Sequence, residues 1–369
     1  MNNYQKVLET RKKQHLLRSL PLPPEGIDFY SNDYLGLAQS SELSSATSTL
    51  SENTKSQNGA TGSRLLSGNS EYAEHVEQLV ANFHENESAL IYSSGYAANL
   101  GLISCLATRD TTLFCDELIH ASLIDGTRLG YSKKIKFQHN NAHDLEQKLE
   151  KQSGQKIVIV ESVYSMDGDV CPLEKMVDVC ENNNAYLIVD EAHSMAVYGT
   201  NGAGLVQMHG LQNKVLARIM TFGKGLGIHG ASVVGPKWLK DYQVNFSRPM
   251  IFSTAPSAHH FRSIEAAYGL LPKIGLAREN LQSMVKYFIE KRIKTKSNWL
   301  ESNTQIQSLI VPGNEQVVKL GQRLSETGIN ALPIRRPSVL EGAERIRICL
   351  HSYNTKEEID LLFRTLDNE

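Results

Sequence analysis

Cysteine, tryptophan and long apolar runs are scarce in this sequence of 369 residues. Five cysteines are present, an odd number, and no two of them form a C-x-x-C pair. This pattern argues against a disulfide framework and a cysteine-rich zinc site, and a reducing cytoplasm is the simplest compartment. No apolar run approaches the ~18–20 residues of a membrane helix. The polar, basic residues 1–20 also lack the apolar core of a secretory signal.

An excess of charge of either sign is also missing. The 38 basic and 40 acidic residues give a net charge of −2, so no bulk charge attracts nucleic acid or an anionic membrane. Hydrophobic residues make up 41% of the chain and charged residues 21%, which is enough to build a large core. Composition therefore favours a globular α/β enzyme.

Short β-rich runs alternate with helical patterns through most of the chain. We expect strands at 88–93, 111–115, 156–161, 185–190, 217–222 and 231–234, and helices at 71–82, 145–152 and 173–182. This alternation predicts a mostly parallel central sheet flanked by helices. Several of the strands are apolar on both faces, as central parallel strands are.

The two ends of the chain lack the regular alternation of strands and helices. Residues 1–20 are expected to form a basic amphipathic helix, ended by the prolines of 21–24. Residues 260–298 are expected to be mostly helical, and 305–369 return to shorter strands and helices. We therefore predict an N-terminal helix and linker (1–38), a large cofactor-binding domain (39–269) and a small C-terminal α+β domain (270–369).

Polar residues follow several predicted strands, at the edge where an open parallel sheet binds its ligands. Lys224 lies between two glycines and is either a surface-turn lysine or one that attacks a carbonyl group. Asp190 ends an apolar strand and either caps the next segment or partners a cation such as a pyridinium nitrogen. His193, three residues further on, is placed to reach the same ligand.

Other strand ends supply a ring-stacking group and a phosphate cup. His120 either stacks on an aromatic ring or only caps a helix. Backbone and hydroxyl donors for a phosphate at a helix N-terminus come from Ser94, Gly95, Tyr96 and Thr221. A lysine, a carboxylate, histidines and a phosphate cup together are what pyridoxal phosphate (PLP) requires.

Three other classes compete with this interpretation. Residues 190–193 spell the DEAH sequence of helicases, but no G-x-x-x-x-G-K-[ST] loop precedes them. A zinc hydrolase would use Asp190 and His193, but the sequence marks neither an H-E-x-x-H motif nor a third ligand. A regulator that senses PLP would carry a DNA-binding segment, and none is recognised.

Eight segments in a fixed order carry a family resemblance. They are SNDYLGL (31–37), GSRLLSG (62–68), SGYAAN (94–99), HASLIDG (120–126), SMDGD (165–169), DEAH (190–193), TFGKG (221–225) and FST (252–254). Together they resemble the α-oxoamine synthases, which are fold-type I PLP-dependent transferases, over nearly the whole chain. The resemblance implies that fold, pyridoxal 5'-phosphate as cofactor and a homodimer with shared active sites.

The resemblance also implies residue roles. Lys224 matches the lysine that binds the cofactor and moves protons, Asp190 the partner of the ring nitrogen, and His120 the histidine stacked on the ring beside the substrate. The remaining cofactor positions are His193 and Ser165 near the phenolic oxygen, Gly95, Tyr96 and Thr221 at the phosphate, and Thr254 reaching the phosphate of the other subunit. The substrate positions are Asn32 and Arg347 at the amino-acid carboxylate, and Arg11, Arg335 and Ser338 near the acyl group. Without the resemblance, Arg347 is either a buried-strand arginine that seeks a carboxylate or an edge-strand arginine in solvent.

The implied reaction is the decarboxylative condensation of L-alanine with a pimeloyl thioester in biotin biosynthesis, carried out by an acyltransferase. Acyl carrier protein and coenzyme A stay open as thiol carriers. Sister enzymes that accept glycine or serine, or that make long-chain acyl signals, also stay open. The chain departs from the family at Ala73, where a histidine is usual and His75 follows, and at Arg336, where proline is usual. The second departure lies at the acyl end of the site.

Overall fold

The computed structural model describes residues 2–14, 16–18, 20, 22, 25–52 and 58–367. The chain forms two compact units. The large unit contains residues 35–164 and 170–278, and the small unit contains residues 1–34, 165–169 and 279–369. These units group the chain differently from the three predicted segments, because the N-terminal residues and the loop 165–169 pack with the C-terminal residues.

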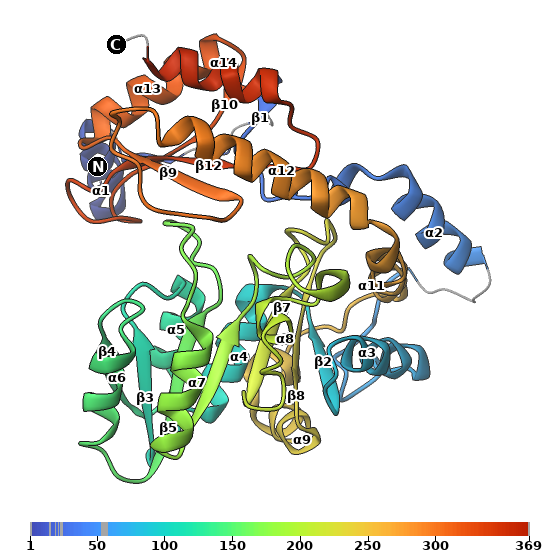
Figure 1. The fold of residues 1–369 in the computed structure, drawn as a ribbon. Coiled ribbons are helices and arrows are strands. Elements are labelled where there is room, and N and C mark those ends of the chain that lie inside the picture. The colour runs from blue at the N-terminus through green and yellow to red at the C-terminus, as the bar shows by residue number, and fades with distance from the viewer. Residues whose placement is uncertain are drawn as a thin grey trace. The chain divides into compact units, whose positions relative to one another are not determined.

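A seven-stranded sheet forms the centre of the large unit (Figure 1). The strand order is β2-β8-β7-β6-β5-β3-β4, and β8 alone runs antiparallel to its neighbours. The strands are β2 (Ser88–Tyr92), β3 (Thr111–Asp116), β4 (Lys133–Phe137), β5 (Gln155–Glu161), β6 (Ala185–Asp190), β7 (Ala217–Thr221) and β8 (Ala231–Gly235). The apolar runs 157–160 and 187–189 are fully buried, as expected for central parallel strands.

Helices surround this sheet. They are α2 (Ser41–Glu52), α3 (Glu71–Phe83), α4 (Gly95–Leu106), α5 (Ala121–Leu129), α6 (Ala142–Leu149), α7 (Leu173–Asn182), α8 (Leu205–Met208), α9 (Lys237–Phe246), α10 (Arg248–Ile251) and α11 (Ala258–Leu270). Three short 3-10 turns are η1 (Leu37–Gln39), η2 (Thr200–Gly202) and η3 (Leu271–Lys273). Helix α12 (Gly275–Arg292) crosses the boundary between the two units.

The small unit is built on an antiparallel sheet of order β11-β12-β9. Its strands are β9 (Ile306–Ile310), β11 (Leu332–Ile334) and β12 (Arg345–Cys349), and a separate parallel pair joins β1 (Ile27–Asp28) to β10 (Ile329–Asn330). Its other helices are α1 (Asn3–Lys13), α13 (Asn314–Glu326) and α14 (Lys356–Asp367). The predicted architecture, a mostly parallel sheet with helices and a smaller α+β part, is confirmed.

One helix prediction is wrong, and the mostly helical stretch predicted at 260–298 is confirmed with one break. Helix α1 ends at Lys13 and does not reach residue 20; it buries no side chain, so only local capping, such as the box between Asn2 and Gln5, sets its ends. The stretch 260–298 is broken at η3, because Pro272 lacks the backbone N–H that a continuous helix needs, and helix α12 stops at Arg292. Of the predicted linker 21–24, residues 21, 23 and 24 lie outside the described residues.

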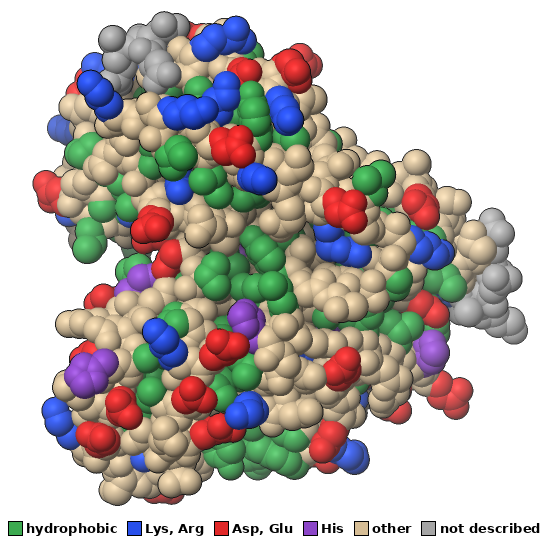
Figure 2. All heavy atoms as spheres, viewed as in Figure 1, with side chains coloured by type: hydrophobic (Ala, Val, Ile, Leu, Met, Phe, Trp, Pro, Cys, Tyr) green, Lys and Arg blue, Asp and Glu red, His purple; other side chains and the backbone are tan. Residues whose placement is uncertain are grey.

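The surface mixes charges of both signs. On the face drawn in Figure 2, basic and acidic side chains are interspersed, in keeping with a net charge of −2. All five cysteines are described, and each is buried and outside any disulfide. Within the described ranges, no helix combines the length and apolar character needed to cross a membrane.

Candidate active site

Two carboxyl groups end neighbouring strands of the large unit. Glu161 ends β5 and Asp190 ends β6, and the two residues are register partners. Asp190 is 4% exposed, and its carboxylate accepts hydrogen bonds from Ala192 N (2.9 Å) and from Asn99 Nδ2 (2.7 Å). Asp190 therefore fixes the turn that follows β6, and its carboxylate is held at the carboxyl edge of the sheet.

Lys224 lies in the loop that follows β7, close to a histidine. Its Nζ is 2.7 Å from Nε2 of the buried His193. At this distance the amine and the imidazole can pass a proton from one to the other. The structure thus brings together the lysine and the histidine that the sequence placed after two different strands, and Lys224 is not a surface-turn lysine.

His120 both caps a helix and presents its ring. It is the N-cap of α5: Nδ1 accepts a hydrogen bond from Ser122 N (3.2 Å) and lies 2.7 Å from Ser122 Oγ. Burial is the largest influence on the pKa of this imidazole and lowers it; Asp190 opposes this effect and Lys224 adds to it. The ring is therefore neutral near pH 7 and lies within electrostatic range of the other predicted catalytic residues.

Sequence reasoning missed three residues here. Asn99 and Ser122 connect Asp190 to His120, and Glu161 accepts a hydrogen bond from the backbone N–H of His120. Burial first, and the neighbouring Asp190 second, raise the pKa of Glu161 well above its usual range. The signal that singled out Asp190, a carboxylate at the end of an apolar strand, also marks Glu161.

The residues predicted to bind a phosphate gather at the N-terminus of α4 and the end of β7. Ser94 caps this helix, with Oγ accepting a hydrogen bond from Ala97 N (3.1 Å). A side chain at Gly95 would collide with Thr221 Oγ1, so glycine lets the helix end approach the end of β7. The half-exposed Tyr96 donates its hydroxyl to Asp125, so its backbone N–H is what it offers to a phosphate.

Thr254 is exposed on the large unit, beside a tightly packed contact. The neighbouring Ala255 donates its N–H to Gly62 O (3.0 Å) and packs against Gly68 so closely that a side chain at Gly68 would collide with it. The 62–68 segment therefore anchors the chain next to Thr254.

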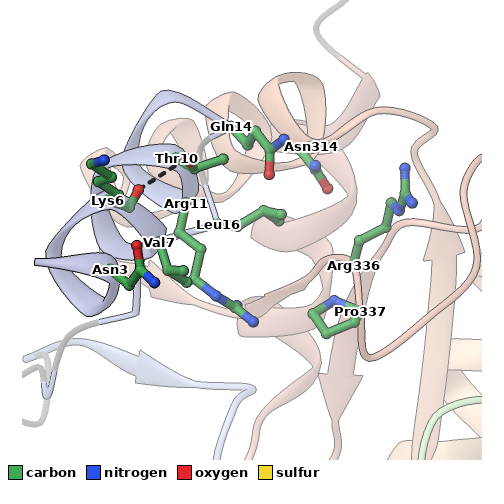
Figure 3. Close-up of a pocket in the computed structure, with 10 residues that line it drawn as sticks. All are labelled: Asn3, Lys6, Val7, Thr10, Arg11, Gln14, Leu16, Asn314, Arg336 and Pro337. Atoms are coloured by element: carbon green, nitrogen blue, oxygen red, sulfur yellow. Dashed lines mark hydrogen bonds between the residues drawn. The ribbon is translucent and has the colours of Figure 1, made fainter.

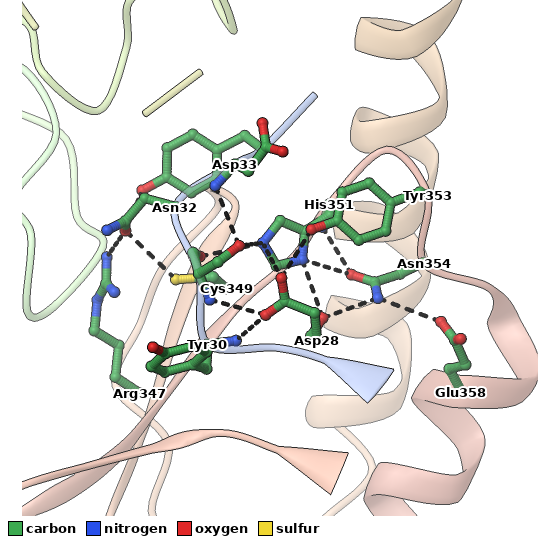
Figure 4. Close-up of polar contacts among 12 residues, drawn as sticks. Asp28, Tyr30, Asn32, Asp33, Arg347, Cys349, His351, Tyr353, Asn354 and Glu358 are labelled. Atoms are coloured by element: carbon green, nitrogen blue, oxygen red, sulfur yellow. Dashed lines mark hydrogen bonds and ion pairs between the residues drawn. The ribbon is translucent and has the colours of Figure 1, made fainter. Parts of the chain in front are cut away.

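In the small unit, Arg347 and Asn32 are brought together (Figure 4). Arg347 Nη2 donates to Asn32 Oδ1 (3.0 Å), and its Nε donates to the backbone carbonyl of Ser165 (2.7 Å). Arg347 lies on β12, the central strand of its sheet, and is 4% exposed. The solvent-exposed edge-strand interpretation of Arg347 is therefore wrong. Ser165 belongs to the small unit, whereas the other predicted cofactor residues belong to the large unit.

The predicted acyl residues lie around helix α1 and the segment 335–338. A cavity of about 860 Å³ (Figure 3) is lined by Asn3, Lys6, Val7, Thr10, Arg11, Gln14, Leu16, Asn314, Arg336 and Pro337. Arg336 also pairs with Glu341 at 2.7 Å. Arg335 and Ser338 are not among these lining residues: Arg335 O accepts a hydrogen bond from Ser338 N (3.0 Å), and Ser338 Oγ accepts one from Arg18 (3.0 Å).

The departure at Ala73 lies on α3. Ala73 is fully buried, whereas His75 is mostly exposed, stacks on Tyr72 and lies 3.6 Å from Glu265. His75 therefore does not occupy the buried position of Ala73.

Comparison with known proteins defines the class. Residues 24–366 match the Aminotransferase class I and II family. The 8-amino-7-oxononanoate synthase of Emericella nidulans is 36% identical over 94% of this chain and 89% of its own length. The chain therefore belongs to the aminotransferase class I and II family, and within it to the family of the 8-amino-7-oxononanoate synthases.

Solved structures agree with this assignment. Serine palmitoyltransferase from S. paucimobilis with bound PLP has a TM-score of 0.90 at 26% identity, covering 99% of this chain and 97% of that chain. The 8-amino-7-oxononanoate synthase of Francisella tularensis has a TM-score of 0.79 at 27% identity, covering 92% and 96%. The predicted family and the fold-type I class are confirmed, and the DEAH sequence does not mark a helicase.

Proposed function

We propose that this chain is a PLP-dependent acyltransferase that condenses L-alanine with a pimeloyl thioester. The products are 8-amino-7-oxononanoate, carbon dioxide and the released thiol carrier. The observation that carries this proposal is the group of Lys224, His193, Asp190 and His120 at the carboxyl edge of the sheet. The names of full-length relatives support the choice of substrates.

The residues present fit PLP. The N-terminus of α4, close to Thr221, suits a phosphate group, and the buried Asp190 suits a protonated ring nitrogen. Lys224 supplies an amine for the cofactor's carbonyl carbon. Bound PLP supplies a ring that withdraws electrons and stabilises negative charge developing on the amino-acid α-carbon.

Each side chain has a separate task in this scheme. Lys224 Nζ takes and returns the proton of the α-carbon, and His193, 2.7 Å away, orients that amine. Asp190 would hold a proton on the ring nitrogen, because a buried carboxylate is stabilised by a cationic partner. The ring of His120, whose lowered pKa favours the neutral form, would pack against the cofactor and keep water from it.

The small unit supplies the site for the amino-acid carboxylate. Arg347 is held by Ser165 O and Asn32 Oδ1, so its planar guanidinium is already oriented before a substrate arrives. An arginine fixed in this way recognises a carboxylate through charge-assisted hydrogen bonds. Arg11, Arg335 and Ser338 are the proposed acyl-side positions, and either acyl carrier protein or coenzyme A serves as the thiol carrier.

The proposed assembly is a homodimer in the cytoplasm, where the five buried cysteines stay reduced. Exposed Thr254 would contact the phosphate in the site of the other subunit. Mixing Lys224→Ala and Thr254→Ala protomers tests this arrangement, because hybrid dimers regain one intact site only if the two residues act across subunits. Hybrids that recover no activity above the separate variants would contradict the shared site.

The central test is a visible spectrum of the purified protein with PLP, titrated with L-alanine, glycine and L-serine. Each titration is run with and without pimeloyl-coenzyme A. We expect absorbance near 420 nm that responds to L-alanine, and release of thiol on adding the thioester. Lys224→Ala should lose this band and all turnover, whereas the exposed Lys237→Ala should keep both. A response to glycine or serine alone would change the product, and no PLP binding would refute the proposal.

A further inference from the structure

A chain of buried and partly buried hydrogen bonds joins the end of β6 to the start of α5. Asn99 Nδ2 donates to Asp190 Oδ2 (2.7 Å) and to Ser122 Oγ (2.9 Å), and Ser122 Oγ lies 2.7 Å from His120 Nδ1. Asn99 is 2% exposed and Ser122 is fully buried, so water does not compete for the two bonds of Asn99, whereas the contact of Ser122 with His120 is partly buried. One amide group therefore holds two residues that approach the cofactor from different elements.

The donor and the acceptor of each hydrogen bond in this series follow from the groups involved. The backbone N–H of Ser122 can only donate, so His120 Nδ1 accepts and carries no proton. The Ser122 hydroxyl accepts from Asn99 and points its own proton at the same Nδ1. The neutral ring of His120 therefore carries its proton on Nε2.

The amide of Asn99 has one stable orientation. Turning it over would place Oδ1 against the Asp190 carboxylate, and two oxygens with no proton between them repel each other. The observed orientation is kept although Oδ1 has no hydrogen-bond partner among the described residues. The two N–H contacts thus decide the orientation.

We propose that Asn99 is a positioning residue, which fixes the Asp190 carboxylate and, through Ser122, holds His120 in the tautomer protonated on Nε2. This inference rests on the proposed function, in which Asp190 meets the ring nitrogen and His120 covers the ring. Asparagine suits the position because one nitrogen carries two N–H donors, one for each partner. Aspartate, which is similar in size, has none.

The first test is the affinity of the apoprotein for PLP, followed by absorbance. Asn99→Ala should raise the Kd for PLP by about 10- to 150-fold, the equivalent of one hydrogen bond to a charged group. Asn99→Asp should raise it further, because it adds a second negative charge beside Asp190. Asn245→Ala, which removes an exposed amide on α9, is the matched control and should leave the Kd unchanged.

A double-mutant cycle with Ser122→Ala tests the connection. Because Asn99 acts on His120 through Ser122, the double variant should lose less affinity than the product of the two single losses. Ser122→Ala removes a single oxygen atom, so it keeps the proposal testable if Asn99→Ala does not fold. Multiplicative effects, or a wild-type Kd in both single variants, would overturn the coupling.

The tautomer has its own readout, the ¹⁵N chemical shifts of labelled histidine, with His120 assigned by its absence from His120→Gln. Wild-type protein should show His120 protonated on Nε2, and Asn99→Ala and Ser122→Ala should shift it towards a mixture. Unchanged shifts in both variants would refute the inference while PLP binding by the wild type still supported the proposed function. Failure of the wild type to bind PLP would instead refute the proposed function.

Discussion

Replacing Glu77 with glutamine removes the charge from a fully buried carboxylate that accepts four hydrogen bonds. Arg64 donates two of them (2.7 and 3.2 Å), Lys240 Nζ donates one (2.8 Å), and the backbone N–H of Ile91 donates one (3.0 Å). Glu77 is inaccessible to solvent and Arg64 is 9% exposed. The substitution therefore leaves the charge of Arg64 buried without its counter-charge.

The size of the effect follows from burial. Breaking a buried ion pair from one side costs about 3–5 kcal/mol, because the remaining charge has lost its partner. Lys240 adds little, since its side chain is partly exposed and can return to water. At about 2–4 °C per kcal/mol for a domain of 150–250 residues, the melting temperature should fall by roughly 6–20 °C.

Urea unfolding followed by circular dichroism, together with thermal melting, measures this loss. The matched control is Glu181→Gln, which breaks an exposed pair with Lys214 and should change stability by less than about 1 kcal/mol. If the two variants unfold with the same free energy, the argument from the buried charge is wrong. Glu77→Gln should also weaken PLP binding, because Arg64 anchors the 62–68 segment that packs beside Thr254.

Three further substitutions test other parts of the molecule. Burial raises the pKa of Glu161, so the folded chain keeps a proton that the unfolded chain releases above about pH 4.3. Glu161→Gln should therefore gain stability relative to wild type as the pH rises above that value, and urea-unfolding free energies that stay parallel across pH would contradict this. The buried His351 ring contacts backbone carbonyls of the turn that carries Asn32. His351→Gln should therefore raise the KM for L-alanine about tenfold with little change in kcat. Steady-state assays at saturating thioester measure both constants. Arg336→Pro restores the usual family residue and removes a positive charge from the lining of the cavity in Figure 3. The KM for the pimeloyl thioester should therefore rise a few-fold, and more at low salt, where charges are less screened. An unchanged KM would mean that Arg336 is only a solvated charge.

The strands were predictable where both of their faces are buried, because burial requires a run of apolar residues. Strands β5 and β6 are buried on both faces, so their runs of isoleucine, leucine and valine reveal them. Strand β4 was missed because it lies at the sheet edge and consists largely of exposed lysines. The length of α1 was overestimated for a related reason. Its side chains are all exposed, so no pattern of buried residues marks where the helix ends.

The candidate site was predictable where the strand order brings its residues to one edge of the sheet. Parallel strands end at one edge, so Lys224, Asp190 and His120 could be grouped from their places after strands. Asn99 could not be grouped in this way, because its partners lie 23 and 91 positions further along the chain. An amide residue in the largely apolar helix α4 is a local signal, and it does not say which groups the amide meets.

The pairing of Glu161 with Asp190 shows how position in the sheet and chemistry combine. Two carboxyl groups at the ends of adjacent strands repel each other when both are ionised, so one of them holds its proton. Asp190 accepts hydrogen bonds from Ala192 and Asn99, whereas Glu161 accepts one from His120 and is raised in pKa by burial and by Asp190 itself. Asp190 thus has two hydrogen-bond donors on its carboxylate, which suits the role proposed for it opposite a cationic ring nitrogen. The raised pKa of Glu161 favours its neutral form, whose carbonyl oxygen still accepts the backbone N–H of His120.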